Sequence, residues 1–426
     1  MRRLHGQGET PCPGESAGNK PPAWLKNGWY LQLDIRNFFV SINRRILFEM
    51  IRNSLHKKYR GGAARLNELC WLTRLLLTGN PAQTAIRQGS PADFARVPAY
   101  KQLANATPEH GLPIGNLTSQ FFANVYLNEL DQFVKHQLKC RYYIRYVDDF
   151  ILLHPSRAQL LIWRQAIIDF LARRLGLQLK ALSMPQPVDN GADFLGYIVR
   201  PDYCLVRRRV VRNLHEKLHV FEKQLCPEPG RLILLADARQ QLHATLASYL
   251  GHFRHAQSEH LLQSLWRRFP WLAHLFQRRA YQLLPRWQPR CVTSFRSQWR
   301  YFVRQWPGHQ VWIQLGKYGY LFDEQAEILS TLPMFPGLER ENSPPCGFQS
   351  CLRMRRKAVP QRLLPWLRRQ RLPYCWVVEA GYLRGGMKLR ILRELFSPLA
   401  DEESTVDTVF KVKHFSNNRV DTAVEF

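Results

Sequence analysis

The sequence lacks the features of a membrane protein or of a secreted, disulfide-bonded one. It has no stretch of about eighteen uncharged apolar residues that could span a bilayer. Residues 1–15 include basic residues but contain no apolar core of a signal peptide. The nine cysteines are odd in number and form no CxxC pair, which argues against a disulfide framework and a zinc site. We therefore expect a soluble, intracellular protein with reduced thiols and no membrane partner.

Acidic residues are also scarce. The chain has 33 Asp plus Glu against 61 Lys plus Arg, a formal net charge of +28. A charge of this size makes polyanions the expected partners, and nucleic acid before a membrane surface. The 426 residues, 45% of them hydrophobic, exclude intrinsic disorder and are too many for one ordinary compact domain.

Hydrophobic periodicity predicts an α+β protein that begins with strands and helices in alternation. Residues 80–113 contain five prolines and predict a long loop. Loops of this length are uncommon in compact domains, so we regard it as a candidate functional loop. An Asp-Asp pair lies inside the first hairpin, and Pro201-Asp202 turns the second. The expected elements are a strand at 29–35, helices at 37–55, 66–79, 116–138 and 157–175, and hairpins at 140–154 and 194–209.

The second half of the chain is more basic. Residues 210–280 have a helical pattern, and residues 200–300 contain eighteen basic and six acidic side chains. Residues 295–329 predict a helix, a strand and a helix, and residues 377–398 end this part. Residues 351–372 carry eight basic side chains and no acid, whereas the last 27 residues are acidic and polar and predict a flexible tail.

Three carboxylates are the sharpest chemical feature. Asp34 ends a predicted strand, and Asp148 and Asp149 lie at the tip of a predicted hairpin. Neighbouring strand ends can supply the carboxylates that hold two Mg²⁺ ions about 4 Å apart for phosphoryl transfer. Taken singly, either feature is more often a turn cap or a polar hairpin turn.

Four motifs in the right order make the chain resemble the reverse transcriptases over residues 29–280. Asp34 to Phe39 (DIRNFF) resembles palm motif A, and Tyr146 to Asp149 (YVDD) resembles motif C. Residues 111–131 resemble motif B and its helix, and FLGYIV at 194–199 resembles the primer-grip hairpin. The resemblance implies an RNA-directed DNA polymerase, a nucleotidyltransferase that uses template RNA, RNA–DNA hybrid and dNTPs.

The resemblance also implies roles for single residues. Asp34 and Asp148 would bind two Mg²⁺ ions, which Mn²⁺ can replace, with Asp149 in support and the Ile35 carbonyl completing one shell. Further substrate contacts are less specific, because each has an ordinary structural alternative such as a core aromatic, a buried strand or an exposed lysine. They are Phe39 under the sugar, Ile114 and Gly115 beside the nascent base pair, Lys180 as proton donor to pyrophosphate, and Phe194, Leu195 and Gly196 at the primer end.

A basic helical region follows the catalytic motifs and resembles a thumb. Its aromatic residues have the spacing of a core, so we assign only arginines to the template–primer backbone. These are Arg254, Arg267, Arg268, Arg278 and Arg279. The expected division is an unstructured or remnant segment 1–28, a palm 29–209, a thumb 210–290, an α/β module 291–400 and a flexible tail 401–426. Fingers are largely absent before Asp34, unless the true start lies upstream of Met1.

Motif B indicates which reverse transcriptases the chain resembles. Its form IGNLTSQ (114–120) is similar to the enzymes of diversity-generating retroelements, which copy a template-repeat RNA with errors at adenine. This implies a cytoplasmic enzyme of a prokaryote or phage and a basic accessory variability protein, an oligomer, as partner. Two alternatives stay open: another prokaryotic reverse transcriptase, of the group II intron maturase or retron type, and a non-catalytic nucleic-acid-binding remnant.

The C-terminal module resembles, more weakly, the N-terminal mismatch-reading domain of the MutS family. Residues 316–322 (GKYGYLF) correspond to the stretch in which that family stacks a Phe on a mispaired base. Tyr318 keeps an aromatic at that place, whereas Tyr320 replaces the Glu. The resemblance implies a module that binds a duplex or hybrid; a purely packing domain is the alternative.

Overall fold

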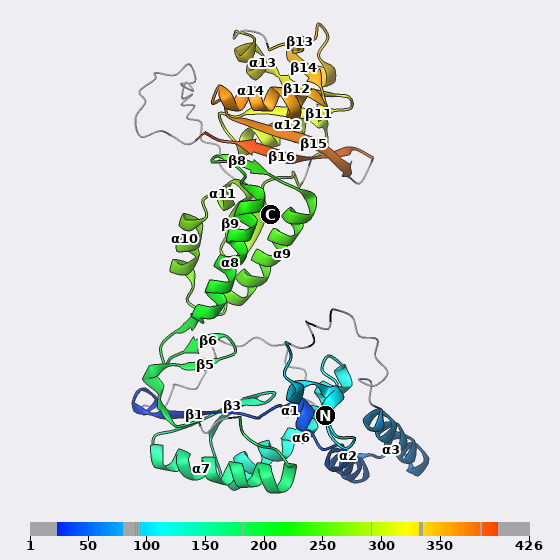
Figure 1. Ribbon diagram of the computed structural model, residues 1–426, viewed down its shortest axis with the longest axis vertical. Helices are drawn as coiled ribbons and strands as arrows, with labels where there is room; N and C mark the ends of the chain where they lie inside the picture. The colour runs from blue at the N-terminus through cyan, green and yellow to red at the C-terminus, as the bar shows by residue number, and fades with distance from the viewer. Residues whose placement is uncertain are drawn as a thin grey trace, which may run out of the picture. The chain divides into compact units, whose positions relative to one another are not determined.

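The computed structural model describes residues 24–79, 90, 92, 94, 96–180, 183–290, 292–331, 335–383 and 386–398. Most of the expected N-terminal segment and the whole expected tail, 401–426, lie outside these residues. The chain divides into two compact units, with the boundary between Leu205 and Val206 (Figure 1). Within the described residues, no helix has both the length and the apolar character needed to cross a bilayer.

A four-stranded antiparallel sheet, ordered β2-β3-β1-β4, forms the centre of the first unit. Because side chains alternate along a strand, Leu31 and Leu33 of β1 and Phe150 of β3 enter one hydrophobic core. Gln32 and Asp34 therefore lie on the opposite face. The strands are β1 (Trp29–Asp34), β2 (Tyr142–Tyr146), β3 (Asp149–His154) and β4 (Gln186–Pro187).

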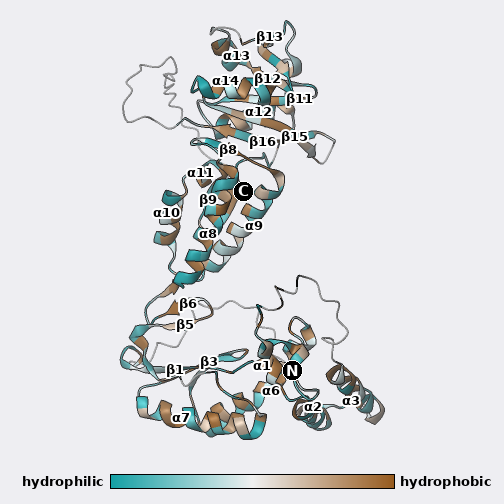
Figure 2. Ribbon diagram, viewed as in Figure 1, coloured by the Kyte–Doolittle hydropathy of each residue, from teal (hydrophilic) through white to brown (hydrophobic). Residues whose placement is uncertain are grey.

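Helices cover the apolar face of this sheet. Tyr126 and Leu130 of α6 (Leu117–Gln132) and Leu160 and Trp163 of α7 (Arg157–Phe170) join the core of β1 and β3. Hydrophobic and hydrophilic residues alternate along α7, as expected for a helix with one buried face (Figure 2). Both helices run directly into π-helical turns, η4 (Phe133–Gln137) and η5 (Leu171–Leu175).

The remaining elements of the first unit surround this sheet. Helix α2 begins at a side-chain cap, because the Asn43 carbonyl oxygen accepts from the backbone N–H of Arg45 and Ile46. A small sheet, ordered β5-β6-β7, follows β4 in the sequence. The helices are α1 (Phe38–Ser41), α2 (Arg44–Lys58) and α3 (Ala63–Thr78), the 3₁₀ turns η1 (Leu25–Asn27), η2 (Ala99–Lys101), η3 (Leu103–Asn105) and η6 (Val188–Asn190), and the strands β5 (Ala192–Phe194), β6 (Tyr197–Val199) and β7 (Cys204–Val206).

The second unit starts with helices whose apolar stripes form one core. Leu214 and Leu218 of α8 meet Leu242 and Leu246 of α9, at the i, i+4 spacing of a helix face. The elements here are α8 (Arg208–Leu225), β8 (Arg231–Ile233), α9 (Ala236–Phe253), α10 (Glu259–Arg268), α11 (Trp271–Leu275) and the hairpin β9 (Phe276–Arg279) and β10 (Gln282–Pro285).

A seven-stranded sheet, ordered β13-β14-β12-β11-β15-β16-β8, completes the second unit. Neighbours along β11 point to opposite faces: Val311 and Ile313 enter the core of the α8–α9 helices, whereas Trp312 enters a second core with Leu364 of α14. The elements are α12 (Phe295–Gln305), β11 (Gln310–Leu315), β12 (Tyr318–Phe322), α13 (Asp323–Ser330), β13 (Glu339–Arg340), η7 (Pro345–Gly347), β14 (Cys351–Arg355), η8 (Val359–Leu363), α14 (Leu364–Arg369), β15 (Tyr374–Tyr382) and β16 (Lys388–Phe396).

The structure differs from the expected elements at three places. The single strand expected in 295–329 is a hairpin, because Gly316 takes a left-handed φ of 59° and turns the chain. Residues 276–285, expected to continue a helix to 280, form a hairpin around left-handed Ala280. The expected hairpin 194–209 has an additional turn at Leu195 and Gly196, before the one near Pro201.

The expected thumb and α/β module share one core. Strand β8, at 231–233, pairs with β16, and core residues of α8 to α11 touch core residues of β11, β12, β15 and β16. Residues from Val206 onward are thus one compact unit. The mixture of helices with largely antiparallel sheets agrees with the predicted α+β class.

Candidate active site

Backbone pairing brings the three predicted aspartates to one edge of the first sheet. Asp34, the last residue of β1, lies opposite Asp149, the first residue of β3. The backbone N–H of Ile35 donates to the Asp148 carbonyl at 3.2 Å. Since directly opposed residues of an antiparallel pair project to the same face, the Asp34 and Asp149 side chains lie on the face away from the helices.

The tip of the β2–β3 hairpin has an unusual backbone conformation. Val147 has a φ of 55°, which is rare and costly for a β-branched residue. Arg145 stabilises it: Nη1 donates to the Val147 carbonyl at 2.9 Å, while Nε and Nη2 donate to Asp131 at 2.8 and 2.6 Å. The Tyr143 hydroxyl also donates to Asp131 at 2.8 Å. The conformation of the tip therefore depends on α6, the helix of motif B.

Two polar side chains contact the carboxylates directly. Gln32 Nε2 donates to both oxygens of Asp149, at 3.0 and 3.2 Å, and to the Asp193 carbonyl at 3.0 Å. Lys180 Nζ lies 2.9 Å from Asp34 Oδ2, and the Lys180 N–H donates to the Asp34 carbonyl at 2.8 Å. Lys180, predicted as the proton donor to pyrophosphate, thus contacts Asp34 directly, and its role stays a prediction.

The electrostatics of the edge favour the arrival of cations. Burial, together with the charge of Asp34, raises the pKa of Asp148 above its ordinary value. Burial also raises the pKa of Asp149, and Asp34 and Asp148 add to this although Gln32 opposes it. The hydrogen bond to Asp34 raises the pKa of Lys180. Carboxylates that repel one another become easier to ionise when a metal ion binds between them.

The donor set fits Mg²⁺, although its members do not converge in this conformation. Among the described residues, no three His, Cys, Asp or Glu side chains are grouped so that they could hold a metal ion. The Asp149 carboxylate accepts a hydrogen bond from Gln32, and the Asp34 carboxylate accepts one from Lys180. The donors are nonetheless carboxylate oxygens on adjacent backbone positions, the hard ligands that Mg²⁺ takes together with waters and substrate phosphates. Rotation of side chains would be enough to bring them together.

The predicted substrate residues lie around motifs A and B. Phe39 is half-buried in α1, and its carbonyl accepts from the N–H of Leu112, which joins motif A to the segment before motif B. Ile114 is 76% exposed. Gly115 has a φ of 103°, and a Cβ there would have no atom within 4 Å, so its backbone faces open space.

The predicted primer-grip residues form the tight turn of the β5–β6 hairpin. Phe194 pairs with Tyr197 and is buried, whereas Leu195 and Gly196 have φ of 53° and 89°. Positive φ at both central positions is typical of a type I′ turn. Leu195 is 39% exposed, so this turn presents an apolar side chain to the surface.

The predicted thumb arginines do not share one environment. Arg278 makes two hydrogen bonds to Glu259, at 2.6 and 3.1 Å, and its guanidinium lies over the Trp266 ring. Four others are exposed at the ends of helices or strands: Arg254, Arg267, Arg268 and Arg279. The aromatic residues Phe269, Trp271 and Phe276 are core residues, as their spacing predicts.

The stretch that resembles the mismatch-reading motif lies in the β11–β12 hairpin. Gly316 and Lys317 form the turn, and Tyr318 begins β12. The Tyr318 ring is partly buried against the core, and the Arg353 guanidinium covers it at 4.9 Å. Tyr318 is therefore not free to stack on a base, and the mismatch-reading resemblance stays a prediction.

Sequence reasoning missed the residues that position the carboxylates. Gln32 could have been found, because it lies two residues before Asp34 and so on the same face of the strand. Arg145 and Asp131 lie on different elements, and only the packing of the hairpin against α6 brings them together. Nothing in the sequence marks Arg145 among the 61 basic residues.

Comparisons with known proteins address the part of the chain that contains this site. Residues 20–199 match the family described as reverse transcriptase (RNA-dependent DNA polymerase). No curated protein matches the chain. Among solved structures, it is similar to telomerase from Candida albicans in complex with a TWJ fragment of telomeric RNA, at 13% identity and a TM-score of 0.27. That alignment covers 53% of this chain and 39% of the telomerase chain.

The matched residues, 20–199, contain Asp34, Asp148 and Asp149, so the similarity to the reverse transcriptase family includes the candidate site. This match supports the predicted enzyme class, an RNA-directed DNA polymerase and hence a nucleotidyltransferase.

Proposed function

We propose that the chain copies a template-repeat RNA into cDNA, with errors at adenine, for diversity-generating retrohoming. The observation that carries the catalytic part is the pairing of Asp34 with Asp149 and of Ile35 with Asp148, which gathers three carboxylates at one sheet edge. The form of motif B, IGNLTSQ at 114–120, carries the retroelement part.

Two Mg²⁺ ions at this edge would activate the primer 3′-hydroxyl and hold the triphosphate. Asp34 and Asp148 are the proposed ligands of both ions, with Asp149 in support and the Ile35 carbonyl completing one shell. Lys180, now 2.9 Å from Asp34, then turns toward the triphosphate. A lysine side chain is ordinarily protonated at neutral pH, so Lys180 can supply the proton that the leaving pyrophosphate needs.

Phe39, Ile114 and Gly115 would line the nucleotide site. The Phe39 ring would exclude a ribose 2′-hydroxyl, which makes the substrate a deoxynucleotide. Most reverse transcriptases carry a Gln at the position of Ile114. Ile114 cannot make the hydrogen bonds that this Gln makes near the incoming sugar and the template base, so the geometry of the new base pair is controlled less tightly. A contact of this size contributes about 1–3 kcal/mol to selectivity, enough for part of an error bias.

Primer extension on an RNA template with Mg²⁺ and dNTPs tests the catalytic proposal. Asp148→Asn is expected to abolish extension and to leave RNA binding nearly unchanged. The matched control is Asp169→Asn on α7, the helix that covers the opposite face of the sheet. Extension by Asp148→Asn would refute the metal assignment.

Sequencing of the cDNA tests the retroelement proposal. Errors concentrated at template adenines, reduced in Ile114→Gln, are the expected result. Faithful copying at adenine would instead favour a reverse transcriptase of the group II intron maturase or retron type. The partners proposed here are template RNA, RNA–DNA hybrid and a basic accessory protein oligomer, and co-purification of that oligomer from cells tests the last.

One observation favours a second candidate, a nucleic-acid-binding protein without catalysis. Lys180 and Gln32 occupy the oxygens of Asp34 and Asp149, and no three-ligand group exists among the described residues. Binding of template and primer without any extension, with both Mg²⁺ and Mn²⁺ tested, would establish this candidate.

A further inference from the structure

The acid-free basic run of the second unit, residues 351–372, contains both paired and unpaired cations. Arg353 forms ion pairs with Glu339 and Glu341 at 3.1 and 2.7 Å, and Arg368 with Glu394 at 2.9 Å. Arg353 and Arg368 therefore form ion pairs within the fold. Arg355, Arg356 and Lys357, at the end of β14, are exposed and form no ion pair with a described acid.

The turn of the neighbouring β11–β12 hairpin adds a fourth cation. Tyr318 pairs with Arg355 in the sheet, and the Arg356 N–H donates to the Lys317 carbonyl at 2.9 Å. Lys317 is exposed and likewise unpaired among the described residues. Two segments that are far apart in sequence thus place Lys317, Arg355, Arg356 and Lys357 at one end of the seven-stranded sheet. We call these four residues the basic sheet end.

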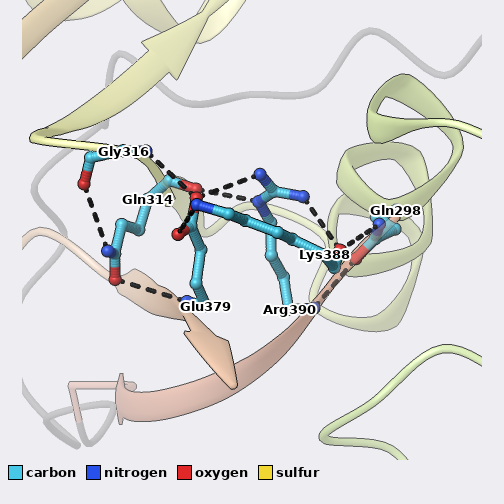
Figure 3. A network of polar contacts seen from close by, with 6 residues as sticks. All are labelled: Gln298, Gln314, Gly316, Glu379, Lys388 and Arg390. Carbon is cyan, nitrogen blue, oxygen red and sulfur yellow. Dashed lines mark hydrogen bonds and ion pairs between the residues drawn. The ribbon is translucent and has the colours of Figure 1, made fainter. Parts of the chain in front are cut away.

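A polar network stiffens the backbone beside these cations (Figure 3). Glu379 accepts from the Gly316 N–H at 3.0 Å, from Lys388 Nζ at 2.8 Å and from Arg390 Nη2 at 3.2 Å. Arg390 is buried and also donates through Nε to the Gln314 carbonyl at 2.8 Å. The turn that carries Lys317 is therefore tied to the β15–β16 hairpin.

The acids near the basic sheet end form their ion pairs with other cations. Glu379 is the acid nearest to the turn in this network, and its charge is already balanced by Lys388 and Arg390. Glu339 and Glu341, on the side of β13, both form ion pairs with Arg353 and none with the basic sheet end. Four exposed cations that are unpaired among the described residues and are carried by neighbouring backbone segments give this surface the positive charge that attracts a nucleic acid backbone.

We propose that the basic sheet end binds the phosphate backbone of a nucleic acid duplex, the RNA–DNA hybrid in particular. The choice of the hybrid over other polyanions rests on the proposed function, because a reverse transcriptase produces such a hybrid, whereas binding of a duplex backbone does not. The contact is independent of base sequence, because phosphates carry no sequence information. It needs neither catalysis nor mismatch reading, so it survives a failure of the proposed polymerase function.

The test measures binding of the full chain to a hybrid of about two helical turns as a function of salt. Arg355→Gln with Arg356→Gln is expected to lower the salt slope by about 1 for each arginine, without changing sequence preference. The matched control is Arg362→Gln with Arg369→Gln, which removes two exposed arginines from the same basic run, on η8 and α14. An equal effect of both pairs, or no effect of the first, would overturn the proposal.

A second measurement uses the unaltered protein and so does not depend on the folding of a variant. Acetylation of Lys317 and Lys357, followed by mass spectrometry, is expected to slow when the hybrid is added. Unchanged acetylation of both lysines at saturating hybrid refutes the proposal. Protection by anionic phosphatidylserine vesicles but not by hybrid refutes it as well and identifies a membrane surface instead.

Discussion

Replacement of Arg145 by Lys tests whether the catalytic hairpin is held from α6. The guanidinium makes two hydrogen bonds to Asp131 and one to the Val147 carbonyl, and its side chain is only 11% exposed. A lysine keeps the charge but cannot make the fork, so at least one charge-assisted bond, about 1.5–3 kcal/mol, is lost. The left-handed Val147, which costs about 1–3 kcal/mol, then relaxes.

We expect the free energy of unfolding of Arg145→Lys to fall by about 2–4 kcal/mol. Primer extension should fall by about 100-fold, because a displacement of roughly 1 Å at Asp148 costs that much. Urea denaturation and single-turnover extension measure the two effects. The control is Arg173→Lys, whose pair with Asp169 is 3.7 Å long and exposed and is worth about 0.3–0.5 kcal/mol. If Arg145→Lys behaved like this control in both assays, the reasoning about the tip would be wrong.

Three further outcomes follow from local geometry. Burial raises the pKa of Asp148 and Asp149 in the native state. Without metal, the native state is therefore stabilised at acid pH and loses that stability as the pH rises through the raised pKa. Thermal unfolding of Asp148→Asn should show a higher Tm than wild type at neutral pH but not at acid pH. Gly319→Ala should lower the free energy of unfolding by about 1–3 kcal/mol, because a Cβ would lie 2.9 Å from atoms of Trp376 and Val359. Leu195→Gly should stabilise the protein by about 1 kcal/mol in urea, since φ is 53° there, and should weaken primer binding if Leu195 contacts the primer.

Local patterns were sufficient to predict the first unit and its site. The strands β1, β2 and β3 are short apolar runs with β-forming residues, and Asp34, Asp148 and Asp149 lie at their ends. These strands could therefore be placed before their pairing was known. Lys180, predicted as a proton donor to pyrophosphate, donates a hydrogen bond to Asp34. The partners that orient these groups, Gln32 and Arg145, escaped prediction because polar side chains at such positions carry no periodic signal.

The second unit was harder to predict because its pairing is long-range. Strand β8 has only three residues, 231–233, and lies inside a helical stretch; it is defined by pairing with residues 394–396 of β16. No window of 11–18 residues contains that information. The two hairpins that replace expected helix and strand turn at Ala280 and Gly316, and a left-handed Ala cannot be foreseen from residue type.

The Lys180–Asp34 pair leads to a last prediction, because it makes Lys180 a competitor of the metal. The Lys180 side chain is 68% exposed and that of Asp34 38%, and exposed ion pairs contribute about 0–1 kcal/mol. Mg²⁺ must break this ion pair in order to bind Asp34. The cost of breaking it should weaken Mg²⁺ binding to the wild-type protein by no more than about fivefold. Lys180→Met should bind Mg²⁺ slightly more tightly, as measured by isothermal calorimetry, yet extend primers more slowly at saturating Mg²⁺, since the proton donor is gone.

Lys135→Met on η4 removes the same charge from another element of the first unit and serves as the control. A protein whose lysine served only to neutralise Asp34 would show the gain in metal affinity without the loss of rate. A loss of both would mean that Lys180 holds Asp34 in place for the metal. The two measurements thus separate a counterion, a proton donor and a positioning residue.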